Sequence, residues 1–253
     1  MRGNPDTERL VQRELVRRNS VVRIVRGADG LSVEKTYHAR YTAKQEYDAY
    51  LALDPVLAIS DRVRRPVIRK VDERRNTIHL EYVDAPDLRK SYLQHGVATL
   101  DAQRHLLIPL FAKARSMDVR FDSDPANFLV ADGGDELVIV DPVAVELDLV
   151  DFNAVVFLWG LIKSFLGNRR WHTIGAFTKC WRRYYTAYLD AVGITSRELN
   201  AQLARYIDVV IGWNLNESGG ESLAKRGFRR FVMVPIWRIT QLPFRLNLVK
   251  AMR

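Results

Sequence analysis

The residues best suited to chemistry are Asp122, Asn127 and Asp141, in the middle of the chain. Asp122 and Asn127 are five residues apart, and Asp141 follows two short predicted strands, 128–130 and 137–140, joined by a turn. Phosphoryl transfer requires a carboxylate near the acceptor hydroxyl and oxygen ligands for magnesium, because negative charge must be neutralised. An Asp-rich turn by itself is also a common helix cap or solvated loop, so the surrounding elements must decide between these interpretations.

The amino-terminal third of the sequence is rich in predicted strands. A β-branched run predicts a strand over 21–26, and alternation of side chains with period two predicts one over 31–37. Two more strands are predicted over 66–71 and 77–83. The first two strands are joined by a Gly-containing turn, which indicates a hairpin. Lys35 therefore lies inside a strand.

Two helices are predicted in the same third of the chain. Apolar side chains among charges predict a short amphipathic helix over 7–18. A second helix is predicted over 42–53, with Thr42 as its N-cap and Glu46 inside it. One face of this second helix is predicted to carry Tyr47, Tyr50 and Leu51.

The rest of the sequence is mainly helical in pattern. Helices are predicted over 88–117, 150–166, 173–192 and 196–212. A β-rich lobe, residues 1–84, is thus expected to precede a larger helical lobe, residues 85–253, which gives an α+β fold class.

The segment 119–130, followed by the hairpin and Asp141-Pro142-Val143, resembles the catalytic loop and metal-binding strand end of the protein-kinase-like phosphotransferases. The resemblance covers about residues 20–190. It implies that Asp122 orients and deprotonates an acceptor hydroxyl, while Asn127 and Asp141 bind Mg²⁺ beside ATP. It also implies a two-lobed fold, with one key helix in the small β-rich lobe.

The same resemblance assigns roles in the amino-terminal lobe. In this family a Lys in an early strand pairs with a Glu in the next helix and holds the α- and β-phosphates of ATP, and Lys35 and Glu46 occupy those places. The segment after the strand over 77–83 is similar to the hinge that binds adenine through backbone groups. Glu81 and Val83 are therefore expected to contact the nucleotide.

The resemblance is strongest to bacterial lipopolysaccharide core kinases, the Kdo and heptose kinases. The aromatic helical segment from Asp151 to Trp159 is similar to theirs. This implies ATP-dependent transfer of the γ-phosphoryl group to a hydroxyl, on a sugar of a lipopolysaccharide-type glycolipid, at the inner face of a bacterial envelope. The aromatic residues are also compatible with ordinary core packing.

The sequence departs from the family pattern in several places. It has no G-x-G-x-x-G, Arg120 replaces the usual His two residues before Asp122, Pro142 follows Asp141, and no A-P-E follows. Loss of the activation segment favours a small-molecule or glycolipid acceptor. A RIO-like protein kinase, an antibiotic phosphotransferase and a non-catalytic pseudokinase adaptor remain alternatives.

Positive charge is concentrated at the carboxyl end. The formal net charge is +9, and residues 225–253 contribute +8 with no Asp or Glu. This segment mixes Arg with apolar side chains, which is compatible with peripheral contact with an anionic membrane or with a terminal helix whose arginines face water. No nucleic-acid-binding signature is present, so no nucleic-acid partner is expected. The absence of a long apolar stretch and the single cysteine favour a cytoplasmic protein, either free or peripheral on the membrane.

Overall fold

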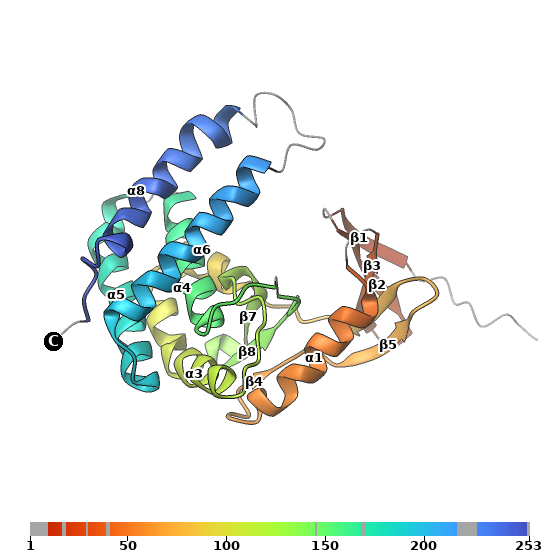
Figure 1. The fold of residues 1–253 in the computed structure, drawn as a ribbon. Helices are drawn as coiled ribbons and strands as arrows, with labels where there is room; N and C mark the ends of the chain where they lie inside the picture. Colours follow the sequence, from red (N-terminus) through yellow and green to blue (C-terminus); the bar gives the residue numbers. More distant parts are fainter. Residues whose placement is uncertain are drawn as a thin grey trace, which may run out of the picture. The chain divides into compact units, whose positions relative to one another are not determined.

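The computed structural model describes residues 10–16, 19–28, 30–38, 41–144, 146–167, 171–216 and 227–251. The fold is α+β (Figure 1). Two compact units make up the chain. Unit 1 comprises Met1–Leu106 and Phe121–Val145, and unit 2 comprises Leu107–Arg120 and Glu146–Arg253.

This division differs from the predicted lobes 1–84 and 85–253. The reason lies in strand pairing, because the hairpin after Phe121 joins a strand of the amino-terminal region. Val63 lies opposite Leu137 in a parallel pair, and the backbone N–H of Leu137 donates a hydrogen bond to the carbonyl of Arg62. The hairpin is thereby part of unit 1.

The main sheet of unit 1 has five antiparallel strands in the order β1-β2-β3-β6-β5. The strands are β1 (Leu10–Val16), β2 (Ser20–Gly27), β3 (Gly30–Tyr37), β5 (Ile68–Asp72) and β6 (Thr77–Glu81). The predicted hairpin is confirmed, and Gly27 pairs with Gly30 at its turn. Gly30 has a φ of 94°, a conformation that glycine adopts without steric cost.

The predicted helix over 7–18 is wrong where the structure describes it. Leu10–Val16 is strand β1, which pairs with β2 and contains a bulge between Val11 and Arg13. The apolar spacing fits a helix, but the open edge of β2 offers a row of backbone hydrogen-bonding groups. Pairing with that edge overrides the local pattern.

Helix α1 (Ala43–Leu57) confirms the second predicted helix. Its buried side is made by Ala43, Glu46, Tyr50, Leu53, Val56 and Leu57. Of the three residues predicted to share one face, only Tyr50 is on the buried side, whereas Leu51 is exposed and Tyr47 is half-buried. The helix packs against β3, β5 and β6 of the main sheet.

A second, smaller sheet in unit 1 carries the central segment. It has the order β4-β8-β7, with β4 (Val63–Arg64), β7 (Phe128–Ala131) and β8 (Glu136–Ile139). The two predicted strands that follow Asn127 are therefore confirmed. Short 3₁₀ turns precede and join them, η1 (Pro125–Asn127) and η2 (Asp132–Gly134).

The helix predicted over 88–117 is two helices, α2 (Leu88–His95) and α3 (Val97–Ser116). Gly96 ends α2 with a φ of 85°, which breaks the helical path. Helix α3 passes from unit 1 to unit 2 after Leu106.

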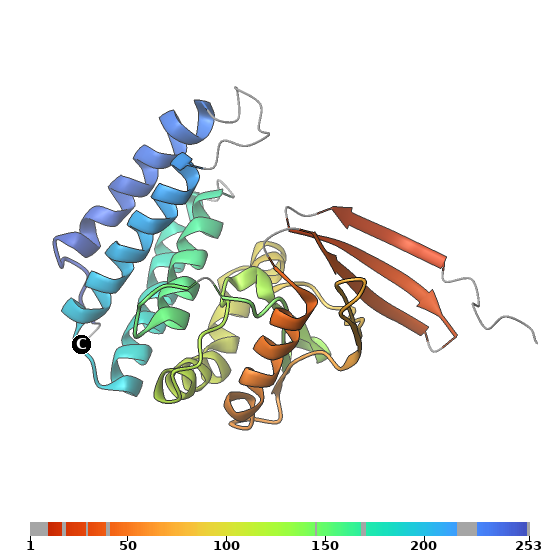
Figure 2. The same cartoon turned by 45° about the vertical axis from the view of Figure 1, so that its right-hand side comes forward.

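Unit 2 is helical after the end of α3. Its elements are α4 (Phe152–Gly167), η3 (Trp171–Thr173), α5 (Ile174–Val192), α6 (Ser196–Asn216), the π-helical turn η4 (Arg229–Met233) and α8 (Val234–Arg245). In both views α6 and α8 run side by side (Figures 1 and 2). Aromatic pairs fill the interior, including Phe157 with Tyr184 and Trp159 with Trp237. None of the helices in the described ranges is long and apolar enough to cross a membrane.

Candidate active site

Lys35 lies in β3, where it pairs with Val22 of β2 and Ile78 of β6. Because β3 is paired with a strand on each side, the backbone of Lys35 is fixed and its side chain projects from a defined point on the sheet. Its side chain is 9% exposed, and Nζ lies 3.0 Å from Glu46 Oε2 and 2.7 Å from Asp141 Oδ1. One buried ammonium therefore joins carboxylates from two distant parts of the sequence.

Glu46 reaches Lys35 because of where α1 begins. The Thr42 hydroxyl accepts a hydrogen bond from the Gln45 backbone N–H, and the Gln45 side chain accepts one from the Thr42 N–H. This reciprocal cap fixes the first turn, which contains Glu46. The Glu46 residue is fully buried. Because burial penalises its charged form more than Lys35 favours it, the pKa of the Glu46 carboxyl is raised.

The charge of Lys35 is maintained by its partners. Burial acts to lower the pKa of the Lys35 ammonium, but Glu46 and Asp141 outweigh that effect and the pKa is raised. The Nζ atom also lies 5.0 Å from the centre of the Tyr37 ring, within the range of a cation–π contact. The Lys35 ammonium is thus buried, charged and next to the solvent-exposed carboxylate of Asp141. Such a cation is suited to binding an anionic ligand.

Asp141 directly follows Val140 at the end of β8, in a left-handed backbone conformation with a φ of 55°. This conformation is uncommon except in glycine, and Asp and Asn tolerate it best. The Tyr50 hydroxyl accepts a hydrogen bond of 3.3 Å from the Asp141 backbone N–H. The side chain of Asp141 remains 57% exposed, although Oδ1 is bound to Lys35. Backbone support from α1 therefore presents this carboxylate to solvent.

The loop from Asp122 to Asn127 is closed by its own hydrogen bonds. Asp122 Oδ1 accepts from the Asp124 backbone N–H at 3.1 Å, and Asp124 caps η1, in which Pro125 is the first residue. The Asn127 side chain donates from Nδ2 to the Asp122 carbonyl at 3.1 Å. That bond fixes the Asn127 amide so that Oδ1 is the atom left to act as an oxygen ligand.

Two backbone hydrogen bonds connect this loop to the residues on either side of Asp141. The Asp122 N–H donates to the Pro142 carbonyl at 3.1 Å, and the Val140 N–H donates to the Asn127 carbonyl at 2.8 Å. Asp122, Asn127 and Asp141 are therefore neighbours in space. The structure brings together the five predicted residues Lys35, Glu46, Asp122, Asn127 and Asp141, all within unit 1.

The oxygen donors suit magnesium in kind. Among the described residues no group of three or more His, Cys, Asp and Glu side chains could hold a metal ion. The predicted pair is one carboxylate, Asp141, and one amide, Asn127. Mg²⁺ commonly takes one or two protein oxygens and completes its shell with phosphate and water, so this pair fits a site that forms together with a nucleotide.

The two predicted hinge residues are at and just beyond the end of β6. Glu81 pairs with Ser32 across from β3, three residues along the strand from the partner of Lys35, or about 10 Å. Its side chain is occupied by Arg64, at 2.8 and 3.2 Å, and by the Val67 N–H. The Val83 carbonyl accepts from Ala85. Adenine contact through the backbone of Glu81 and Val83 stays a prediction.

Sequence reasoning missed Tyr50 as part of this site. Tyr50 is fully buried, and burial raises the pKa of its hydroxyl well above the usual value, so the hydroxyl stays protonated. The available signal was its position four residues after Glu46, which places both side chains on one helix face.

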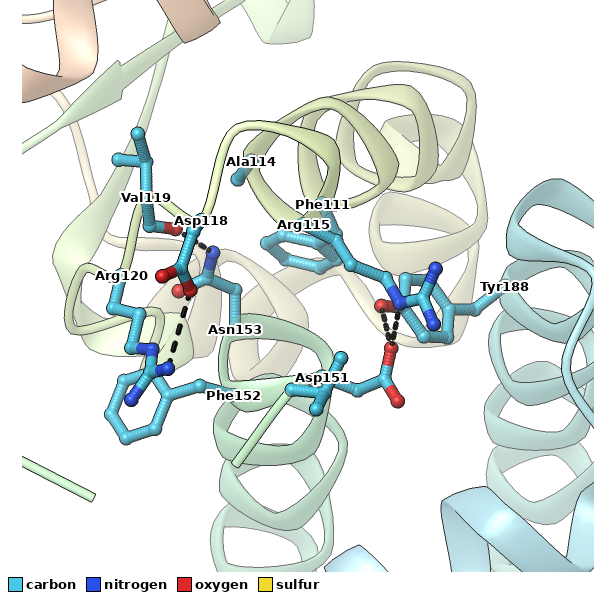
Figure 3. A pocket seen from close by; sticks show the side chains of 11 residues that line it. Phe111, Ala114, Arg115, Asp118, Val119, Arg120, Asp151, Phe152, Asn153 and Tyr188 are labelled. Carbon is cyan, nitrogen blue, oxygen red and sulfur yellow. Dashed lines mark hydrogen bonds and ion pairs between the residues drawn. The ribbon is translucent and has the colours of Figure 1, made fainter. Parts of the chain in front are cut away.

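A second buried polar cluster lies in unit 2, at the start of α4 (Figure 3). Asp151 is 2% exposed and contacts Arg115 Nε and the Tyr188 hydroxyl, each at 2.7 Å, and also the Gln202 amide. The adjacent pocket has a volume of about 10 Å³, which holds at most one water molecule. This cluster therefore belongs to the packing of the helical unit.

The same region fixes the chain that leads to Asp122. The Asn153 side chain donates to the Val119 carbonyl at 2.8 Å (Figure 3). Arg120 donates to the Leu147 carbonyl at 2.7 Å. Arg120 thus has a structural contact within unit 2. Comparison with known proteins adds no assignment, because no family model and no curated protein matches the chain.

Proposed function

We propose that this chain is a protein-kinase-like phosphotransferase that uses ATP and Mg²⁺ to phosphorylate a hydroxyl group. One observation carries the proposal: the Lys35 ammonium contacts Glu46 and Asp141, while Asp122 and Asn127 are hydrogen-bonded to the backbone on both sides of Asp141. These side chains come from separate elements, and random surface charges do not converge in this way. Perturbed buried pairs beside an exposed carboxylate are typical of functional sites.

Each residue has a task that its environment supports. Lys35 binds the α- and β-phosphate oxygens, and Glu46 holds the ammonium in place through its ion pair. Asn127 Oδ1 and the exposed Asp141 carboxylate would hold Mg²⁺, which when bound neutralises charge on the phosphates. Asp122 accepts the proton of the acceptor hydroxyl, and its loop keeps it close to the other oxygens.

The acceptor is proposed to be a sugar hydroxyl of a lipopolysaccharide-type glycolipid. Only residues 142–151 lie between Asp141 and α4. That connection is short, and a protein kinase with a regulated peptide-docking segment needs a longer one. A compact acceptor fits this connection better than a bound peptide does. The proposed location is the cytoplasmic side of the membrane, where the enzyme would bind such a glycolipid acceptor.

The test is product formation with the full chain. We would incubate it with γ-labelled ATP, with and without Mg²⁺, and with three acceptor classes: glycolipids, aminoglycosides and proteins. Labelled glycolipid formed only with Mg²⁺ supports the whole proposal. Label on an aminoglycoside or a protein supports phosphoryl transfer and overturns the acceptor. If the chain binds ATP–Mg²⁺ but none of the three acceptor classes is labelled, the pseudokinase alternative is favoured.

A further inference from the structure

The terminal helix α8 is apolar on two opposite sides. One side packs on unit 2 through Val234, Trp237, Gln241 and Phe244. The Gln241 amide donates to the Ala204 carbonyl of α6, and Trp237 and Phe244 contact the rings of Trp159 and Trp181. A terminal helix held in this way normally turns polar side chains outward.

The outward side of α8 does not follow that rule. Ile239 is 65% exposed, Leu242 is 50% exposed and Leu246 is 63% exposed. Their spacing of three and four residues places them in one row, about opposite to the buried row. Apolar exposure extends over the neighbouring turns, where the exposed side chains are Phe228, Phe231, Val232, Ile236 and Leu248. Exposed apolar side chains gathered on one helix and its flanking turns are typical of an interaction surface.

Basic side chains border this apolar row. Arg230, Arg238 and Lys250 are exposed. Arg245 contacts Asp208 of α6 at 2.6 Å. Residues 225–253 contain no Asp or Glu. The row is therefore apolar in the middle and positive at its border.

We propose that the outward row of α8, Ile239, Leu242 and Leu246 with Phe231, docks on the surface of an anionic phospholipid bilayer. Aliphatic side chains enter the interface between headgroups and acyl chains, and the arginines and lysine meet headgroup phosphates. A second copy of this chain is disfavoured as the occupant, because it would bring two positive borders together. Nucleic acid offers phosphates but no site for exposed aliphatic side chains. The inference is independent of the phosphotransferase proposal, because it uses only unit 2.

Vesicle flotation with the full chain and no nucleotide tests this proposal. We expect binding to vesicles of phosphatidylglycerol and phosphatidylcholine at 30:70, and at least about tenfold weaker binding to pure phosphatidylcholine. Binding to the anionic vesicles should fall between 0.05 and 0.5 M salt, since the charges are exposed. Equal binding to both kinds of vesicle, or none to either, overturns the proposal.

Two variants separate the apolar and charged contributions. I239S/L242S should reduce binding to anionic vesicles at least about tenfold, because it removes apolar area that would enter the interface. R238Q/K250Q should also reduce it about tenfold and weaken the salt dependence. Both changes are at exposed positions, so the melting temperature should stay near that of the wild type.

A matched control removes exposed apolar side chains elsewhere. L51S/V67S changes two exposed positions of unit 1 and should bind vesicles as the wild type does. If the control loses binding to the same degree as I239S/L242S, α8 is not the docking surface. The wild type could instead fail to bind vesicles and sediment as a dimer, while I239S/L242S sediments as a monomer. In that case the row docks on a second copy of the chain, and the lipid proposal is wrong.

Discussion

Lys35 lies between two carboxylates that differ in exposure, since Glu46 is fully buried and the Asp141 side chain is 57% exposed. The buried partner fixes the ammonium, and the exposed one is available to a ligand. Replacement of Lys35 by Met leaves Glu46 as a buried carboxylate without its cation. Loss of one partner of a buried pair typically costs about 3–5 kcal/mol.

The K35M variant should gain a steep pH dependence of stability. Burial raises the pKa of the Glu46 carboxyl, and loss of Lys35 removes the charge that opposes this rise. A group whose pKa is higher in the folded state contributes its stability below the unfolded value and loses it as pH rises through the folded value. Urea unfolding from pH 4 to 8 should show K35M losing more stability than the wild type as pH rises. K35M/E46Q should abolish the difference, and a K35M profile parallel to the wild type would contradict this account.

Tyr50 is expected to position Asp141 through the backbone. Replacement by Phe leaves the Asp141 N–H without the hydroxyl that accepts from it. Net loss of one hydrogen bond costs about 0.5–1.5 kcal/mol. If the binding of ATP–Mg²⁺ beside Asp141 weakens by that free energy, KM rises by up to about tenfold. Steady-state kinetics should show a larger change in KM than in kcat. An unchanged KM would show that Tyr50 does not position Asp141 for nucleotide binding.

The sequence predicted single site residues where both the residue type and the spacing were specific to one kind of chemistry. Lys35, Glu46, Asp122, Asn127 and Asp141 were predicted as one site, and the structure brings them together. Tyr50 was not predicted as part of it, because an aromatic residue on a helix is usually core and its hydroxyl contact depends on tertiary structure.

Elements were predictable where local signals and tertiary contacts agreed. The hairpin over 21–37 has a Gly-containing turn, and α1 has a capping residue at Thr42. Leu10–Val16 was mispredicted because its apolar spacing suits a helix, and the partner edge that makes it a strand is supplied by β2. Periodicity placed Leu51 on one face with Tyr47 and Tyr50, but it could not say which side of the helix the sheet covers, and Leu51 is exposed.

The start of α1 is expected to matter for stability. Thr42→Ala removes the hydroxyl that accepts from Gln45 and should lower the free energy of unfolding by about 1 kcal/mol. Lys44→Ala is the matched control, because Lys44 is exposed and its ion pair with Asp48 contributes only about 0.3–0.5 kcal/mol. Urea unfolding of both variants measures the difference. Equal losses for the two would show that the cap does not fix α1.

On the scale of the whole molecule, ligand binding should stabilise the chain by mass action. ATP with Mg²⁺ at 100 times its Kd adds about 2.7 kcal/mol to the free energy of unfolding. The melting temperature should therefore rise by roughly 5–10 °C, with less effect from ATP in EDTA. Asp141→Asn should abolish the Mg²⁺-dependent part of the rise, because it removes the carboxylate charge. A rise that D141N retains in full would place the metal elsewhere.

The division into units was less accessible from sequence than the elements were. Predicted lobes followed the change in composition near residue 84, whereas the compact units follow contacts between β4 and β8. That pairing joins residues more than seventy positions apart, which no local pattern encodes. The outward apolar row of α8 likewise becomes visible only when the buried side of the helix is known.

The most direct test of the central claim is label transfer from γ-labelled ATP by the Asp122→Asn variant. Asp118→Asn makes the same chemical change at an exposed carboxylate four residues earlier and serves as the control. If Asp122 accepts the acceptor proton, D122N should lower the transfer rate about 10²–10⁴-fold while D118N and the affinity for ATP–Mg²⁺ stay near wild type. A D122N variant that transfers label at the wild-type rate would contradict the assignment of this loop as catalytic.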